Sequence, residues 1–331
     1  MKLEVRFLKN TEIHIFQKLV KYHFPKKNHI FVKKTPVINF YYNFLKNKNL
    51  KILGLFYSKK LVAAQGLITM DNWDPKLKKH FYLAFTVKSN KYKKDCLILF
   101  LNFIYNLKPN FLGTVGTNMS TAGMILNKIS KIKNLDHYYI SNPIIKKKIS
   151  IGLVNINKDK MIDKCIKMKT DRTLNKLPNT TFEPRKSKKY FINRYLNNPF
   201  YKYDLMKFYK NNKLQFFFIF REVYVKSFKV KIIRIVDFYG SFPKNFNISQ
   251  HIIDYLLKNN IEYIDFMVSG IENNLMKRLG FKKKNKNIHI PNHFEPYDNN
   301  KPLLNYGIFI NKYKKEALVF KGDGDQDRPN K

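Results

Sequence analysis

The stretch from Lys231 to Phe281 decides the fold of this chain. It opens with the apolar run Ile232-Ile-Arg-Ile-Val-Asp-Phe238, which predicts a strand that ends at Gly240. Apolar residues then recur at helical spacing over 248–258, and a second strand-like run covers 261–268. A short helix is expected to close the stretch at Phe281. A strand that returns through a helix to a neighbouring strand is typical of a layered α/β sheet.

The length and composition predict a folded protein of two domains. The chain has 331 residues, of which 44% are hydrophobic, so both domains can bury a core. The two cysteines, Cys96 and Cys165, match neither a metal-binding spacing nor a disulfide framework, which suits a reducing compartment. The sequence shows no apolar signal core and no uncharged run long enough for a membrane span. We therefore expect a cytoplasmic protein without a transmembrane segment.

The formal net charge of +41 admits two explanations. Such a chain is attracted to nucleic acid, anionic membranes or acidic carriers. However, Lys, Asn, Ile, Phe and Tyr are all served by AT-rich codons, and a biased genome would raise lysine everywhere. The lysines are spread along the whole sequence and form no single basic block, which favours compositional bias. We expect no specific binding of duplex DNA.

The two halves of the chain show the same order of predicted elements. Each has a hairpin, a strand, a polar or basic loop, a helix, a strand and a short helix. In the first half the hairpin covers 51–70, and the later elements cover 81–87, 95–106, 111–115 and 120–130, with a closing strand at 138–140. This order indicates an internal duplication. We expect domains at 1–154 and 187–331, separated by a linker or crossover at 155–186.

The pattern resembles the acetyltransferase fold usually called GNAT, present in two copies as mixed α/β sheets. The strand 81–87 and the helix 95–106 match the family's donor-binding strand and helix, and Asn118 stands at the position of the family's Asn. The stretch 275–281 is similar to its terminal helix and Gly-Phe ending. The resemblance implies an acetyl-CoA or other acyl-CoA donor, whose pyrophosphate would lie at a helix N-terminus.

The first half matches the donor-binding pattern better than the second. The loop from Lys88 to Asp95 lacks the family's glycines but offers three lysines for the phosphates. A second explanation for this loop is an ordinary solvated segment. The donor-binding residues expected from the resemblance are Val87, Lys91, Lys93, Lys94 and Asn118.

Three acidic or basic side chains are candidates for the chemistry. Asp237 ends an apolar strand and fits either a general base or a structural carboxylate that caps a turn or pairs with Arg234. His293 and Glu295 alternate along the chain and would lie on one side of an extended segment as a base and its orienting group. A surface loop fixed by the flanking prolines explains the same pattern.

Aromatic and basic residues near position 200, together with an acidic tail, are candidates for substrate binding. Arg194, Tyr195 and Tyr201 would stack on a sugar or nucleotide, or else pack into the core. Asp323, Asp325 and Asp327 alternate before Arg328. A calcium loop is excluded because Arg328 stands where that loop needs Gly. The tail is expected either to fold back and hold an amine or sugar hydroxyls, or to be a free acidic end.

The tail also resembles the ending of tandem GNAT-like proteins of bacterial surface-polysaccharide clusters, and the layout is similar to Fem-type aminoacyl transferases. The first function implied is N-acyl transfer from acyl-CoA to an amine, such as an amino sugar or a sugar nucleotide. The second is aminoacyl transfer from tRNA, which would account for the charge. The third is a non-catalytic binding module.

Overall fold

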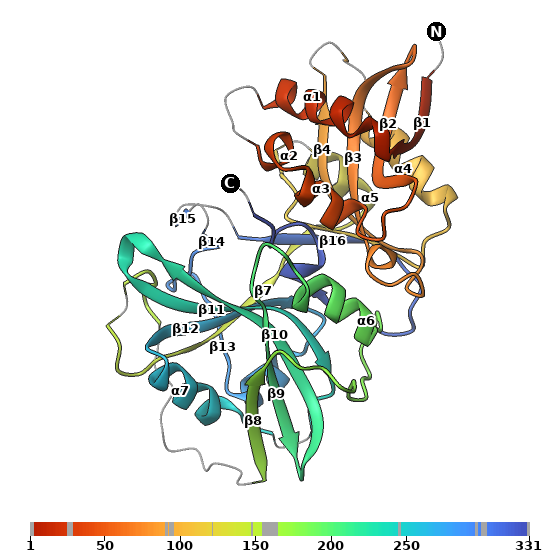
Figure 1. Ribbon diagram of the computed structural model, residues 1–331. Coiled ribbons are helices and arrows are strands. Elements are labelled where there is room, and N and C mark those ends of the chain that lie inside the picture. Colours follow the sequence, from red (N-terminus) through yellow and green to blue (C-terminus); the bar gives the residue numbers. More distant parts are fainter. Residues whose placement is uncertain are drawn as a thin grey trace. The chain divides into compact units, whose positions relative to one another are not determined.

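The chain folds into two compact units, seen in the computed structural model of Figure 1. The first comprises Met1–Lys133, Asn305–Lys312 and Asp323–Lys331, and the second comprises Asn134–Leu304 and Tyr313–Gly322. The residues that the structure describes are 3–24, 29–89, 92, 96–120, 122–146, 148–153, 165–243, 246–294, 297–298 and 303–329.

The first unit is built on a mixed sheet in the order β1-β2-β3-β4-β5-β16-β6. Its strands are β1 (Leu3–Lys9), β2 (Asn49–Tyr57), β3 (Lys60–Thr69), β4 (His80–Lys88), β5 (Phe111–Val115), β6 (Lys133–Asn134) and β16 (Asn305–Asn311). Its helices are α1 (Ile13–His23), α2 (Ile30–Lys33), α3 (Thr35–Tyr42), α4 (Leu97–Asn106) and α5 (Ala122–Ile129), with single turns at η1 (Asn10–Glu12) and η2 (Met70–Asn72).

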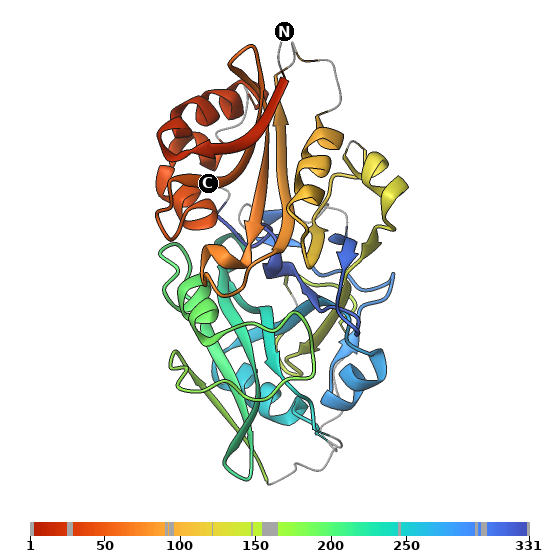
Figure 2. The same ribbon diagram turned by 90° about the vertical axis from the view of Figure 1, so that its right-hand side faces the viewer.

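Helices cover both faces of this sheet, as Figure 2 shows with α1–α3 in red and α4 and α5 in yellow. The face under α4 holds a mainly aliphatic core in which Phe100 and Ile104 are fully buried against strand residues such as Leu112. The opposite face is aromatic: the ring centroid of Phe85 lies 5.1 Å from that of Phe31 and 5.4 Å from that of Phe16. The sheet is therefore sealed on both sides, as the run of buried residues along β3 and β5 requires.

The second unit repeats this plan in the order β8-β9-β10-β11-β12-β7-β13. Its strands are β7 (Asp136–Ser141), β8 (Ile166–Asp171), β9 (Asp204–Lys210), β10 (Lys213–Val225), β11 (Val230–Gly240), β12 (Ile261–Ser269), β13 (Lys282–Lys283) and β17 (Val319–Phe320), with a small separate sheet of β14 (His293–Phe294) and β15 (Tyr297–Asp298). Its helices are α6 (Lys188–Phe191), which continues into the π-helix η3 (Ile192–Leu196), α7 (Ser249–Lys258) and α8 (Asn273–Leu279). Single turns are η4 (Lys226–Phe228) and η5 (Lys321–Asp323), and η5 crosses from the second unit into the first.

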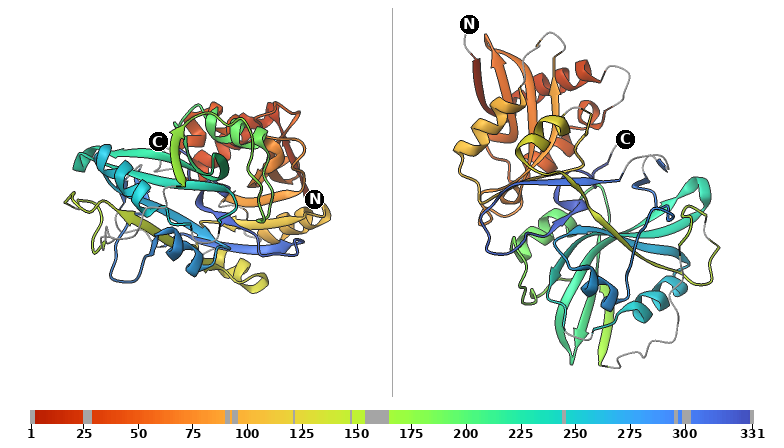
Figure 3. Two further views of the ribbon diagram at one scale, coloured as in Figure 1. Left: turned by 90° about the horizontal axis from the view of Figure 1, so that it is seen from below. Right: turned by 180° about the vertical axis from the view of Figure 1, so that it is seen from behind.

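Each sheet takes its sixth strand from a distant part of the chain. The sixth place in the first sheet is filled by β16, which comes after β7–β15 of the second unit in sequence. The sixth place in the second sheet is filled by β7, which follows directly after β6. Both strands can be followed by colour in Figure 3, β16 in blue and β7 in yellow-green. The predicted mixed α/β class is confirmed, and the two sheets share one strand order.

The units differ from the contiguous domains 1–154 and 187–331 expected from the sequence. Residues 138–140 do form a strand, but β7 pairs antiparallel with β12 in the second sheet. The expected linker at 155–186 contains β8, an edge strand that pairs with β9. Its sequence Ile-Lys-Met-Lys-Thr-Asp buries only its first residue fully, so it carries little apolar signal. The periodicity of a strand reports which face is buried but not which strand lies beside it.

Because β16 comes from a distant part of the chain, the stability of the first sheet should be sensitive to substitutions in this strand. Ile308 lies in the centre of β16 between β5 and β6, opposite Gly113. Ile308→Pro removes a backbone donor from a central strand and should destabilise the first unit by about 3 kcal/mol. Hydrogen exchange should then accelerate over Phe111–Val115, and Lys314→Pro, in the loop that follows β16, should leave these amides protected. Unchanged protection of β5 in the Ile308→Pro protein would contradict the assignment of β16 to this sheet.

Candidate functional site

In the first unit the parallel pairing of β4 with β5 stops before β4 ends. Pairing covers His80–Leu83 against Phe111–Thr114, whereas β4 continues to Lys88. Among the residues that the structure describes, no strand pairs with this edge of β4 from Ala84 to Val87. The open edge presents backbone N–H and C=O groups to any extended ligand.

A β-bulge lies at the start of this open edge. Ala84 and Phe85 of β4 lie opposite the single residue Gly66 of β3. The Phe85 ring covers Gly66 so closely that a Cβ at position 66 would lie 2.4 Å from Cε1 of the ring. A bulge rotates the backbone locally, and bulges are common beside functional sites because they re-aim individual groups.

The space between β4 and β5 beyond their last paired residues forms a gap. Polar contacts at the end of β5 line the side of this gap opposite β4. The Thr114 hydroxyl donates to the Leu83 carbonyl over 3.2 Å and lies 2.9 Å from the Thr117 hydroxyl. Asn305, at the start of β16, accepts from the Thr117 N–H over 2.7 Å and donates to its carbonyl over 2.8 Å. Asn118 is exposed, and its side-chain oxygen accepts from the Ser120 N–H ahead of α5. The strand end is thus held rigidly beside the gap.

The donor-binding residues expected from the sequence are only partly visible. Val87 is buried in β4 opposite Ala64, on the strand that carries the open edge. Asn118 lies beyond the end of β5, across the gap. Lys91, Lys93 and Lys94 lie outside the described residues, between β4 and α4 in the sequence. The helix α4 has ten residues and presents a positive dipole end at its N-terminus.

The acidic tail packs on the first unit and is no free end. Gly324 approaches β5 so closely that a Cβ would lie 3.1 Å from the Val115 Cβ. The Tyr41 hydroxyl donates to the Asp327 carbonyl over 3.2 Å. Arg328 donates from Nε to Asp325 over 3.0 Å, and its guanidinium carbon lies 4.6 Å from the Phe31 ring centroid. The tail therefore lies beside the carboxyl end of β5.

In the second unit the corresponding gap is filled by the chain itself. The parallel pairing of β11 with β12 ends at Ile235 and Phe266, and Val236 forms a bulge just beyond it. Past this point β12 pairs antiparallel with β17 through Val268 and Phe320. Because β7 already occupies the other edge of β12 at Val268, β17 lies on the side of β11. The space between the two strands is therefore taken by residues 319–322.

Three predicted site residues hold this C-terminal segment. Asp237 is fully buried and accepts from Nζ of Lys186 with both oxygens, each over 2.8 Å, and from the Tyr195 hydroxyl over 2.9 Å. Nζ of Lys186 lies 4.6 Å from the Phe320 ring centroid. Arg194 donates to the Gly322 carbonyl. The structure brings Asp237, Arg194 and Tyr195 together, but around a segment of the same chain.

The N-terminus of α7, in the second unit, is also occupied by other parts of the protein. The Ser249 N–H donates to the Asn247 side chain over 2.9 Å, and the Ile248 N–H donates to the Leu279 carbonyl over 3.1 Å. Gly280, with φ of 99°, packs where a Cβ would lie 2.3 Å from the Ser249 Cβ. These contacts use two of the backbone donors that an anion would need.

The remaining candidates lie elsewhere in the second unit. His293 is half-buried in β14, and Glu295 lies outside the described residues. Tyr201 packs under Arg221, whose guanidinium carbon lies 4.2 Å from the ring centroid. Arg234 was a candidate partner of Asp237 but pairs with Asp265.

Sequence reasoning missed a buried charge network on β11, β12 and β7. Arg234 donates from Nε to Asp265 over 3.0 Å, and His137 Nε2 lies 2.8 Å from the same carboxylate. Burial opposes ionisation of Asp265, but Arg234 and His137 outweigh it and hold the pKa of Asp265 well below its usual range. One sequence signal for the network was the presence of Arg234 and Asp265 inside two otherwise apolar runs.

Comparison with known proteins identifies the fold. No family model matches the sequence, and no curated protein matches it either. A GCN5-related N-acetyltransferase from Anabaena variabilis is similar in structure, with a TM-score of 0.52 over 93% of this chain and 72% of that chain at 9% identity. Both halves of this chain have the GNAT fold. A probable N-acyltransferase from Enterococcus faecalis gives a TM-score of 0.51 over 94% and 73% of the two chains at 10% identity.

The likeness to the two neighbours covers nearly the whole of this chain. At about one identical residue in ten the likeness is one of fold. Within the described residues, no helix is both long and apolar enough to cross a membrane.

The ion pair around Asp237 predicts a stability effect that separates a structural role from a catalytic one. Lys186→Met leaves the Asp237 charge buried without its partner and should lower the free energy of unfolding by about 3 to 5 kcal/mol. Adding Asp237→Asn removes that charge and should restore part of the loss. Lys189→Met, at an exposed position on α6, should change stability by less than about 0.5 kcal/mol. Chemical denaturation measures all three, and a Lys186→Met protein as stable as the original would exclude the structural role.

Proposed function

We propose that the chain is an N-acyltransferase that moves an acetyl or related acyl group from an acyl-CoA to an amine. We further propose that the first unit binds the donor. One observation carries this assignment: the edge of β4 beyond its pairing with β5 has no strand partner among the described residues, whereas β17 fills the same place in the second unit.

The open edge of β4 suits the chemistry of an acyl-CoA. The pantetheine arm is an extended chain with two amide groups, and such a chain pairs with a free strand edge through main-chain hydrogen bonds. The pyrophosphate would lie at the N-terminus of α4, with Lys91, Lys93 and Lys94 supplying positive charge. Asn118, exposed beyond β5, would add an amide contact. The thioester would then come to the bulge at Ala84 and Phe85.

The reaction needs correct positioning of the two substrates, a base for the amine proton and donors for the oxyanion. The neutral amine nitrogen attacks the thioester carbonyl carbon, the C–N bond forms, and the C–S bond breaks. The amine gives up a proton to a base, and the CoA thiolate takes up a proton as it leaves. Backbone N–H groups at the bulge are suited to stabilise the oxyanion of the tetrahedral intermediate.

The tail supports an amine as the acceptor. Asp325 and Asp327 are both buried and lie in a chain with 64 Lys and Arg residues but only 23 Asp and Glu residues. Carboxylates beside the end of β5 would attract a cationic amine and repel competing anions. We propose that Asp323, Asp325, Asp327 and Arg328 form the acceptor side of the site, and that the acceptor is an amino sugar or sugar nucleotide of a surface glycan.

For three second-unit residues we propose a role in structure. Asp237, Arg194 and Tyr195 are engaged with Lys186 and with the C-terminal segment, so they hold the filled gap closed. Tyr201 packs under Arg221, which also fits a structural role. The assignment of His293 and Glu295 as a base and its orienting group stays a prediction.

A Fem-like aminoacyl-tRNA-dependent transferase is the second candidate, and the net charge of +41 favours it. Binding of tRNA would weaken steeply with salt, because each neutralised phosphate releases counterions. A non-catalytic binding protein is the third candidate, favoured by the filled gap in one of the two copies.

Donor binding by the first unit is tested with CoA itself. Replacing Lys91, Lys93 and Lys94 by Ala should weaken CoA binding by about tenfold or more, because each lost charge-assisted contact is worth about 1 kcal/mol or more. The control is Lys210, Lys213 and Lys226 replaced by Ala, which removes the same charge from the second unit. Calorimetry at 0.15 M salt (about physiological) gives both affinities. Equal losses in the two triple variants would mean that the charge acts diffusely, and no binding of CoA to the original protein would remove the proposal.

The tail is tested through the acceptor. Asp325→Asn with Asp327→Asn should raise KM for a cationic amine by about tenfold, because a buried carboxylate–ammonium contact is lost. The affinity for CoA should stay within about twofold of the original. Release of CoA thiol with a panel of amino sugars, polyamines and amino acids measures the first effect. An unchanged KM for every productive amine would assign the tail to structure alone.

A further inference from the structure

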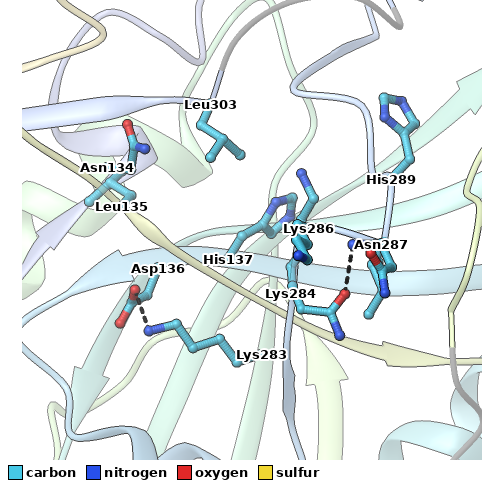
Figure 4. A pocket seen from close by; sticks show the side chains of 12 residues that line it. Asn134, Leu135, Asp136, His137, Lys283, Lys284, Lys286, Asn287, His289 and Leu303 are labelled. Atoms are coloured by element: carbon cyan, nitrogen blue, oxygen red, sulfur yellow. Dashed lines mark hydrogen bonds and ion pairs between the residues drawn. The ribbon is translucent and has the colours of Figure 1, made fainter.

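The second unit contains a pocket of about 480 Å³ on the edge of β12 opposite to its filled gap. It lies where the start of β7 meets β13 and the segment that continues to His289. Figure 4 shows its side chains: Asp136 and His137 come from β7, and Lys283, Lys284 and Lys286 come from β13 and the segment after it. This volume is in the range of sites for small molecules of metabolic size.

The lining of this pocket is strongly cationic. Asp136, the one carboxylate among the described lining residues, lies 2.6 Å from Nζ of Lys283 and accepts from the Tyr138 hydroxyl over 3.3 Å, so its charge is already compensated. Lys284, Lys286 and His289 line the same space. Burial lowers the pKa of Lys284, since taking an ammonium out of water disfavours its charge. An anion in the pocket would offset that cost.

His137 is a buried polar residue of the lining, with 4% of its surface exposed. Its Nε2 lies 2.8 Å from the Asp265 carboxylate, which Arg234 keeps ionised. Nε2 therefore carries the proton and donates it to Asp265, so Nδ1 carries the lone pair in the neutral ring. Within the described part of the chain Nδ1 has no hydrogen-bond partner. A buried polar atom without a partner indicates a ligand or a water that completes it.

We propose that this pocket binds a phosphorylated small molecule with a polar organic part, such as a sugar phosphate or a nucleoside diphosphate. The phosphate lies between Lys284, Lys286 and the protonated Nδ1 of His137. Three amides, Asn134, Asn285 and Asn287, line the pocket and suit hydroxyl groups or a base edge, and Leu303 offers an apolar wall. This site does not depend on the proposed acyl transfer, and its residues all belong to the second unit.

Binding of the phosphate is coupled to a proton. Burial lowers the pKa of His137, Arg234 on β11 and Lys284 after β13 lower it further, and Asp265 on β12 offsets this only in part. A bound phosphate dianion raises the pKa of His137 above its pKa in the ligand-free protein. Affinity for the ligand should therefore increase as pH falls through the pKa that His137 has in the complex, and binding at neutral pH should take up a proton.

The experiment titrates the full chain with inorganic phosphate, glucose 1-phosphate and UDP by calorimetry at pH 7 and about 0.15 M salt. The organic phosphates should bind more tightly than inorganic phosphate, and the better of the two identifies the organic part. Their apparent enthalpy should differ between phosphate-free buffers of different ionisation enthalpy, which reports the proton taken up. Lys284→Gln with Lys286→Gln should weaken the better ligand by about tenfold or more.

Two controls make the result specific. Lys210→Gln with Lys213→Gln removes the same charge from the β9–β10 hairpin and should change affinity by less than about twofold. His137→Gln should abolish the dependence of enthalpy on buffer. Equal losses in the two lysine variants, equal affinity for inorganic phosphate and both organic phosphates, or no binding at millimolar concentration would each overturn the proposal.

Discussion

Both units of this chain depend on the same constraint. In each, two parallel strands stop pairing with each other before the strands themselves end. Each backbone N–H and C=O group beyond that point needs a partner, because an unpaired buried group costs about as much as a lost hydrogen bond. The chain meets this need in two ways. In the second unit β17 supplies the partner for β12, and in the first unit the edge of β4 has no strand partner among the described residues. One fold thus yields a closed copy and an open copy.

Buried charges specify how the strands of the second unit are aligned. Asp237 with Lys186, and Asp265 with Arg234 and His137, lie in strands whose other residues are apolar. Buried pairs of this kind add little net stability, since desolvation offsets most of their attraction, but a wrong alignment leaves a charge unpaired. They therefore fix the register of β11, β12 and β7 and the position of residues 319–322. The lysines on the surface carry no such information, which agrees with their even distribution along the sequence.

The sequence predicts the local elements well and their partners poorly. The strand expected at 232–238 lies within β11, the helix expected over 248–258 is α7, and the strand expected over 261–268 is β12. Burial of one face or stripe produces these periodic signals, so they are visible in one sequence. Pairing is a property of distant segments, and nothing in residues 138–140 indicates that β7 belongs beside β12. The same limit applies to sites. Arg194 and Tyr195 have the composition of a sugar-binding surface, yet they are buried, because the residues that cover them lie more than a hundred positions later.

The exchanged strands have a consequence for how the protein is made. During translation the first sheet waits for residues 305–311, so the first half emerges with β5 and β6 lacking the strand between them. The first sheet therefore cannot be completed before most of the chain has been synthesised, unlike in tandem proteins that fold one domain after another. An exposed strand edge during synthesis is also a template for aggregation, which makes chaperone occupancy of the nascent first half an advantage. Because each sheet contains a strand from a distant part of the chain, neither unit can be removed without taking a strand from the sheet of the other.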